Sequence, residues 1–221
     1  YYTRVENLSV PITVFRCDFS KKNHMEYLFT IFHRLNTGCL KLNNQEIRNC
    51  IYGGGLNNLL KELDNYPAWR RLNKMGKDQL YRFTKQEVIL RFMAFHDRAS
   101  TYEGHLAKFL NTYMHEHQNP PQDFLEEKKS LFTRTVDCVF EKIFAKEAPS
   151  KLPITILEAV LVGVAKNLDS LAALPAATAR ARYEQLGNHQ EFSELALKEG
   201  LSKKPRVIAR LNTATRIFAG N

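Results

Sequence analysis

Apolar residues recur at every third or fourth position through most of this chain, which is the spacing of amphipathic helices. Two stretches carry few polar residues, 84–99 and 154–168, so we expect both helices to lie at the centre of the fold. The full pattern predicts helices at residues 22–35, 43–51, 56–63, 67–72, 84–99, 106–117, 121–144, 154–168, 171–186 and 190–198, with a last one after Pro205.

One short stretch follows a different rule. Residues 10–15, VPITVF, are rich in β-branched side chains, and Pro11 stands near their start, where a missing backbone N–H matters least. A lone strand is not stable, so this one would pair with strands outside the helical part. We therefore expect a mainly α protein with a remnant strand near its N-terminus.

The joint between the first two helices carries polar residues suited to an anion. Asn36, Thr37 and Gly38 are typical of a helix end, and Asn43 or Asn44 can cap the next helix with Glu46 in its first turn. A cation, polar side chains and free backbone N–H groups around one loop would suit a phosphate. An ordinary helix-turn-helix joint with a solvated arginine explains the same residues.

The letters of this joint resemble the signature of GmrSD-type, ParB-related proteins, a family of modification-dependent restriction systems with a "DGQR" motif. Cys39 departs from the pattern, because the family has a second glycine there, and no Asp-Gly-Gln-Arg string occurs in the chain. The matching positions are Phe32, Arg34, Leu35, Asn36, Thr37, Gly38, Leu42, Gln45, Glu46, Ile47, Arg48 and Asn49.

The resemblance implies a helical bundle that follows the last strand or strands of a ParB-like α+β core. Residues 1–72 would be the rear of that core with the signature, and residues 73–221 a helical bundle domain. The front of the core, with the DGQR segment, would then lie upstream of Tyr1 or have been lost.

The resemblance also implies a function, which is to bind a nucleoside triphosphate, with Mg²⁺ as its companion, and to regulate a partnered nuclease domain or subunit. No complete catalytic motif is present in the chain, and we assign no catalytic residue. On this interpretation Arg34 offers charge to phosphate, Asn36, Thr37 and the Gly38 backbone position it, and Glu46 and Arg48 support the loop as an ion pair.

Charge and composition add a second hypothesis. Lys and Arg number 32 against 23 Asp and Glu, a formal net charge of +9, which makes DNA a plausible partner. Arg206, Arg210 and Arg216 would give the last helix a basic face. The alternative function is thus a non-enzymatic helical scaffold that binds nucleic acid or protein, including a relative that kept the fold and lost hydrolysis.

Several classes of protein are disfavoured. The four cysteines form no C-x-x-C pair and His115 and His117 lie on different helix faces, so we expect no metal site. No apolar run approaches the ~18 residues of a membrane span. Few cysteines in a chain of 221 residues suggest reduced thiols, and we expect a cytoplasmic protein.

Overall fold

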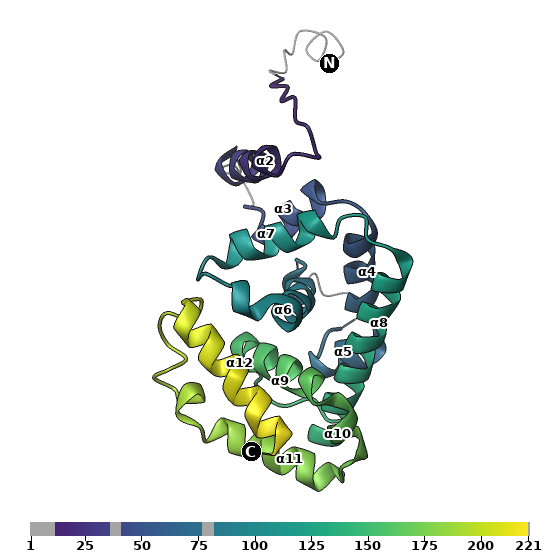
Figure 1. Cartoon of the computed structure of the whole chain (residues 1–221), viewed down its shortest axis with the longest axis vertical. Coiled ribbons are helices and arrows are strands. Elements are labelled where there is room, and N and C mark those ends of the chain that lie inside the picture. The colour runs from purple at the N-terminus through teal and green to yellow at the C-terminus, as the bar shows by residue number, and fades with distance from the viewer. Residues whose placement is uncertain (1–11, 36–40, 77–81, 221) are drawn as a thin grey trace, which may run out of the picture.

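The computed structural model describes residues 12–35, 41–76 and 82–220 as a mainly helical protein (Figure 1). Within these ranges no β-strand is present. The longer helices, in chain order, are α2 (Lys22–Leu35), α3 (Asn44–Ile51), α4 (Gly55–Asp64), α5 (Pro67–Leu72), α6 (Thr84–Arg98), α7 (Leu106–Glu116), α8 (Gln122–Asp137), α9 (Ile154–Lys166), α10 (Leu168–Ala173), α11 (Ala176–Gly187) and α12 (Lys204–Ala219).

The strand expected at residues 10–15 is wrong for the part that the structure describes. Residues 12–15 lie outside any strand, and Ile12 and Val14 are 80% and 79% exposed. Their β-branched side chains favour an extended backbone, but a strand also needs a neighbour for its N–H and C=O groups. Residues 12–35, 41–76 and 82–220 offer no such neighbour.

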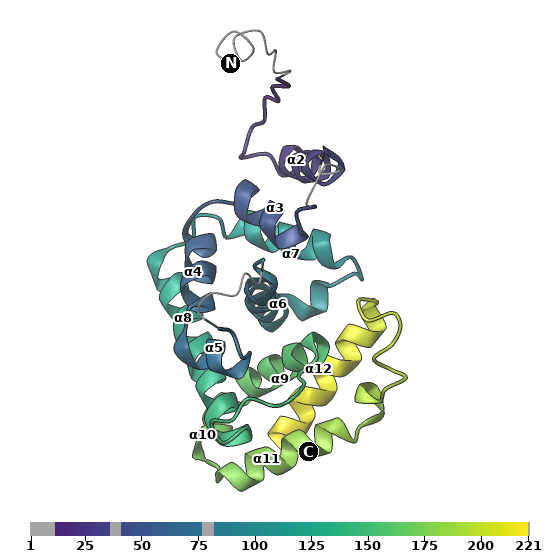
Figure 2. The ribbon, with the colours of Figure 1, turned by 180° about the vertical axis from the view of Figure 1, so that it is seen from behind.

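The two nearly all-apolar helices are central, as expected. α6 packs against α4, α7 and α9, and α9 packs in turn against α12 and α8. Figure 2 shows α6 almost end-on, between α7 on one side and α9 on the other. Ile89, Phe92 and Leu161 are fully buried there. The division of the chain into domains at residue 72 stays a prediction.

The helices of the C-terminal half differ in detail from the sequence prediction. The long helix expected at 121–144 is α8, followed by a π-helical turn, η2 (Cys138–Ile143). The alanine-rich helix expected at 171–186 is split into α10 and α11, because Pro175 occupies the N-cap of α11. Residues 190–198 form only the 3₁₀ turn η3 (Gln190–Phe192) and further turns.

α9 and α12 approach each other closely at Gly163. A Cβ atom on Gly163 would lie 2.8 Å from the carbonyl carbon of Ala214 and 2.9 Å from Cδ2 of Phe218. Because backbone cannot yield as a flexible side chain does, Gly163→Ala should lower the free energy of unfolding by about 1–3 kcal/mol, measured by urea denaturation. Gly187→Ala is the matched control, since nothing lies within 4 Å of its Cβ position and no loss is expected. Equal stability of the two variants would contradict the close contact.

Candidate functional site

The joint between α2 and α3 lies at one end of the molecule. Figures 1 and 2 both show α2 at the edge, beyond α3 and α7. α2 contacts α3 and α7, with Met25 fully buried. Three of the residues expected to bind phosphate, Asn36, Thr37 and Gly38, lie outside the described residues.

Arg34 is in the last turn of α2 and is exposed. Among the residues that the structure describes, no carboxylate or carbonyl lies within ion-pair or hydrogen-bond distance of its guanidinium. A cation in the last helical turn is favoured by the helix dipole, so its position needs no ligand. The charge of Arg34 nevertheless remains available to an anionic ligand.

The start of α3 is fixed by the capping box that the sequence predicted. The side-chain oxygen of Asn43 accepts hydrogen bonds from the N–H groups of Gln45 and Glu46, both at 2.9 Å. The Glu46 carboxylate accepts one from the N–H of Asn43 at 2.6 Å. These three N–H groups are therefore occupied, and the expectation of free N–H donors is wrong at this end of the loop.

Glu46 makes a second contact that the sequence did not reveal. Its carboxylate accepts hydrogen bonds from Nε of Arg82 at 2.9 Å and from Nη2 of Arg82 at 2.6 Å. The Arg82 hydrogen bonds, the largest influence, lower the pKa of Glu46 below its ordinary value. Asn43 also donates to the backbone carbonyl of Arg82 at 2.6 Å, so the two chain segments are tied together.

Arg48 is buried in the interior, with 1% of its surface exposed. Its Nε donates to Oδ1 of Asn111 at 2.8 Å, and its Nη1 donates to Gln45 at 3.1 Å and to Oε2 of Glu87 at 2.8 Å. Burial, the largest influence, lowers the pKa of Arg48, and Glu87 opposes that shift. The ion pair expected between Glu46 and Arg48 is wrong, because each charge has a different partner.

Glu87 is a partner that the sequence did not reveal. It lies in the first turn of α6, where Phe83 holds the N-cap position without a side-chain cap bond. The Glu87 carboxylate accepts from Arg48 and, at 2.7 Å, from Nη2 of Arg91. Burial works against its ionisation, but Arg91 and Arg48 outweigh burial and lower the pKa of Glu87.

The charge network continues from Glu87 into the core. Nη1 of Arg91 lies 3.7 Å from Oε2 of Glu158, a residue of α9 that is 3% exposed. Burial, opposed by Arg91 and Arg210, raises the pKa of Glu158 to about 7. A chain of paired charges thus runs from α3 through α6 to α9.

A separate polar cluster surrounds Asp97, near the end of α6. Lys128 donates to its Oδ1 and Tyr113 to its Oδ2, both at 2.7 Å. Burial opposes ionisation, yet the hydrogen bonds from His96, Lys128 and Tyr113 hold the pKa of Asp97 well below its ordinary range. Asp97 is therefore a satisfied partly buried anion rather than the wall of an open cleft.

Across residues 12–35, 41–76 and 82–220, no three His, Cys, Asp or Glu side chains come together in a way that could hold a metal ion. No helix in these ranges combines the length and the apolar character needed to cross a membrane.

The cap of α3 gives a first prediction for this region. Asn43→Ala removes the acceptor for two N–H groups and the donor to the Arg82 carbonyl. We expect the free energy of unfolding to fall by about 1 kcal/mol, measured by urea denaturation. Asn44→Ala, one position later in the first turn of α3, is the control and should change stability little. A loss confined to the control would place the cap at Asn44.

Comparison of the chain with protein-family models, with curated proteins and with solved structures finds no match in any of the three.

Proposed function

We propose that this chain is the helical part of a GmrSD-type, ParB-related module of a prokaryotic restriction or anti-phage defence system. In such a module it would help to bind a nucleoside triphosphate, accompanied by Mg²⁺, and so regulate a nuclease. The proposal rests on the resemblance of residues 32–49, and one observation on this chain supports it most. The two signature arginines have opposite environments, Arg34 exposed and Arg48 buried.

This contrast suggests that Arg48 has a structural role and that Arg34 contacts the ligand. Arg48 is buried, and its Nε and Nη1 already donate to Asn111, Gln45 and Glu87, so it is held away from any phosphate at the loop. Arg34, at the loop, keeps its donors and its charge, which are what a triphosphate needs. Asn36, Thr37 and Gly38 would complete the binding loop, as the resemblance implies.

Glu46 and Arg48 are positioning residues on this proposal. Glu46 fixes the first turn of α3 through the capping box and Arg82, and Arg48 anchors the next turn to α6 and α7. A loop whose far end is held in this way would bind an anion with little loss of conformational entropy.

The outer side of α2 supports the idea of a missing ParB-like core. Tyr27 and Leu35 are exposed although large and apolar, and Ile12, Val14 and Phe15 just before α2 are exposed too. Exposed apolar side chains are candidates for such an interaction. The last strand and first helix of an α+β core would cover those of α2.

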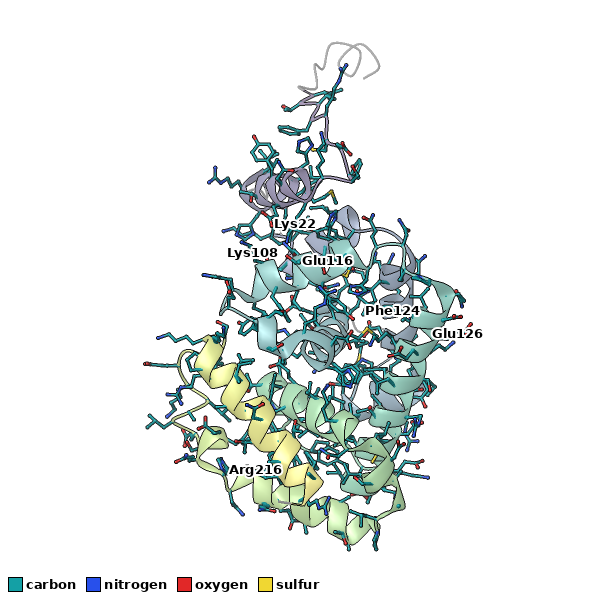
Figure 3. All side chains as sticks on the ribbon, in the orientation of Figure 1. Lys22, Lys108, Glu116, Phe124, Glu126 and Arg216 are labelled. Atoms are coloured by element: carbon teal, nitrogen blue, oxygen red, sulfur yellow. The ribbon has the colours of Figure 1, made fainter. Side chains whose placement is uncertain are left out.

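The test is a triphosphate titration of the complete protein that contains this chain. Arg34→Ala should weaken binding of GTP or ATP with Mg²⁺ about 10- to 100-fold, because a charged hydrogen bond contributes about 1.5–3 kcal/mol. Arg216→Ala is the control, since Arg216 is exposed on α12, away from α2 (Figure 3). Unchanged affinity of Arg34→Ala would remove Arg34 from the site.

A second candidate function is a scaffold that binds DNA without a nucleotide. One surface favours it, the N-terminal part of α12 and the residues before it, where Lys203, Lys204 and Arg206 are exposed. Arg210 does not belong to this basic face, because it is buried. Duplex binding that falls steeply with salt and ignores triphosphate would favour the scaffold.

A further inference from the structure

A cleft of about 400 Å³ lies among α6, α9 and α12, separate from the joint that the proposed function uses. One wall is the segment that leads into α12, where Tyr102 donates a hydrogen bond to the carbonyl of Ser202. Nη2 of Arg210 donates to the neighbouring carbonyl of Leu201 at 2.6 Å. These bonds hold the wall in place. Figure 1 shows the start of α12 beside the segment between α6 and α7.

Two buried side chains that line this cleft each have an atom without a hydrogen-bond partner. Oε2 of Glu158 is a buried acceptor and Nη1 of Arg210 is a buried donor, and neither is satisfied by any described residue. Glu158 is 3% exposed and Arg210 2%. A buried polar group without a hydrogen bond destabilises the fold, so a fold that retains two of them at one cavity calls for a bound molecule. That molecule must both donate to Glu158 and accept from Arg210.

The two arginines that line the cleft, Arg91 and Arg210, are already balanced by acidic neighbours, which argues for a neutral ligand. Arg91 pairs with Glu87 at 2.7 Å and lies 3.7 Å from Glu158, while Glu158 and Glu191 both attract the Arg210 charge. Arg206, which also acts on Arg210, is exposed to solvent, where its charge is screened. An anion or a cation would upset this balance in a site of low dielectric constant.

The remaining lining is apolar and partly aromatic. Phe95 and Tyr102, whose ring centroids are 5.2 Å apart in an edge-to-face arrangement, form one side, with Leu106 and Val207 beside them. Apolar walls with a few convergent polar groups are typical of small-molecule sites, and 400 Å³ is within their usual range. The volume exceeds the ~30 Å³ share of a single water molecule many times over.

We propose that this cleft binds a nucleobase by its hydrogen-bonding edge, with guanine as the best fit. In its ionised form, which a titration at pH 8 ensures, the Glu158 carboxylate accepts from the N1–H and 2-amino groups of the base, and Nη1 of Arg210 donates to O6. Arginine to guanine O6 is among the commonest contacts of protein–DNA interfaces. The ring lies against the apolar side of the cleft. The base comes either from a free nucleoside or from an unstacked position in a nucleic acid, and the chemistry of recognition is the same.

The first experiment is a titration of the protein with guanosine, followed by saturation-transfer NMR and calorimetry. Saturable one-to-one binding is expected. 1-Methylguanosine, which lacks the N1–H donor, should bind at least tenfold more weakly. A single-stranded oligonucleotide with one guanine among thymines distinguishes the sources, since tighter binding than guanosine identifies the polymer and weaker binding identifies the free nucleoside.

Three variants locate the site. Glu158→Gln removes the charged acceptor and should weaken guanosine binding about tenfold. Ile154→Trp narrows the mouth of the cleft from a residue that is 38% exposed, so folding is preserved, and it should abolish binding. Arg216→Gln, exposed on the same α12, is the matched control and should bind like the original protein.

Either of two results would overturn the inference. One is no binding of guanosine or of the oligonucleotide at millimolar concentration, with ordered water alone in the cleft. The other is binding that Ile154→Trp leaves unchanged, which would put the base elsewhere. Neither result depends on Arg34, so failure of the cleft proposal and failure of the proposed triphosphate site can be told apart.

Discussion

Replacement of Arg48 by methionine should lower the free energy of unfolding by about 3–5 kcal/mol, the cost of breaking a buried charged pair by removing one partner. Methionine matches the length of the arginine stem but provides no donor. The side-chain oxygens of Asn111 and Gln45 would then be buried without the hydrogen bonds they now accept. Glu87 would keep only Arg91 as its cation.

Urea denaturation measures this loss as a lower midpoint concentration, with the dependence of the free energy of unfolding on urea concentration unchanged. Arg180→Met is the control, because Arg180 forms an exposed pair with Glu184 that contributes at most about 1 kcal/mol. Arg48→Lys should recover only part of the loss, since an ammonium group cannot reach three acceptors in the fork geometry of a guanidinium. Similar denaturation curves for Arg48→Met and Arg180→Met would show that the interior tolerates the loss of this cation.

Glu158 should make stability depend on pH in the range where most carboxylates do not. Its pKa in the folded protein is about 7, against an ordinary value of 4.5. Between these values the folded protein holds a proton that the unfolded chain has released, so the free energy of unfolding falls as pH rises. The difference in pKa corresponds to about 3 kcal/mol lost between pH 4.5 and 7.

Glu158→Gln removes this titration and keeps the shape of the side chain. The free energy of unfolding of the variant, minus that of the original protein, should therefore rise by about 3 kcal/mol from pH 4.5 to pH 8. Glu184→Gln, at an exposed position on α11, is the control and should show no such trend. Parallel pH profiles for the original protein and Glu158→Gln would mean that Arg91 and Arg210 keep Glu158 ionised.

The helices were predictable because their signal is local. Three-and-four spacing of apolar residues located α2, α6 and α9, and the asparagine and glutamate around residue 43 marked the start of α3. Where a helix was wrong, a local signal had been underweighted. Pro175, for example, interrupts the alanine-rich stretch between residues 171 and 186 and divides it into two helices.

The charge partners were not predictable, because they come from distant positions. Glu87 has the spacing of a capping residue relative to Thr84, yet Arg48, 39 positions earlier, takes its carboxylate. Arg82 reaches Glu46 across 36 positions. Arg210 looked like part of a basic face, but the three-and-four spacing of α12 also turns it toward α9.

One signal for the cleft was present in the sequence and was missed. Glu158 is the sole acidic residue in the stretch ITILEAVLVGVA, an otherwise apolar run. Burial of an ionised acid at such a position costs several kcal/mol unless a cation or a hydrogen-bond donor pairs with it. Tyr102 and Arg210, which lie near it in space, come from the segment after α6 and from α12 respectively, so only the fold brings them together.

The partners of Arg48 also set an order for synthesis on the ribosome. Asn111 follows Arg48 by 63 positions, so the guanidinium stays hydrated until α7 has left the exit tunnel. The segment around Arg48 must then wait, open to chaperones, for residues that are translated seconds later. Slow codons translated after Arg48 has left the tunnel and before α7 has left it would lengthen that exposure, and the same codons placed before Arg48 would not.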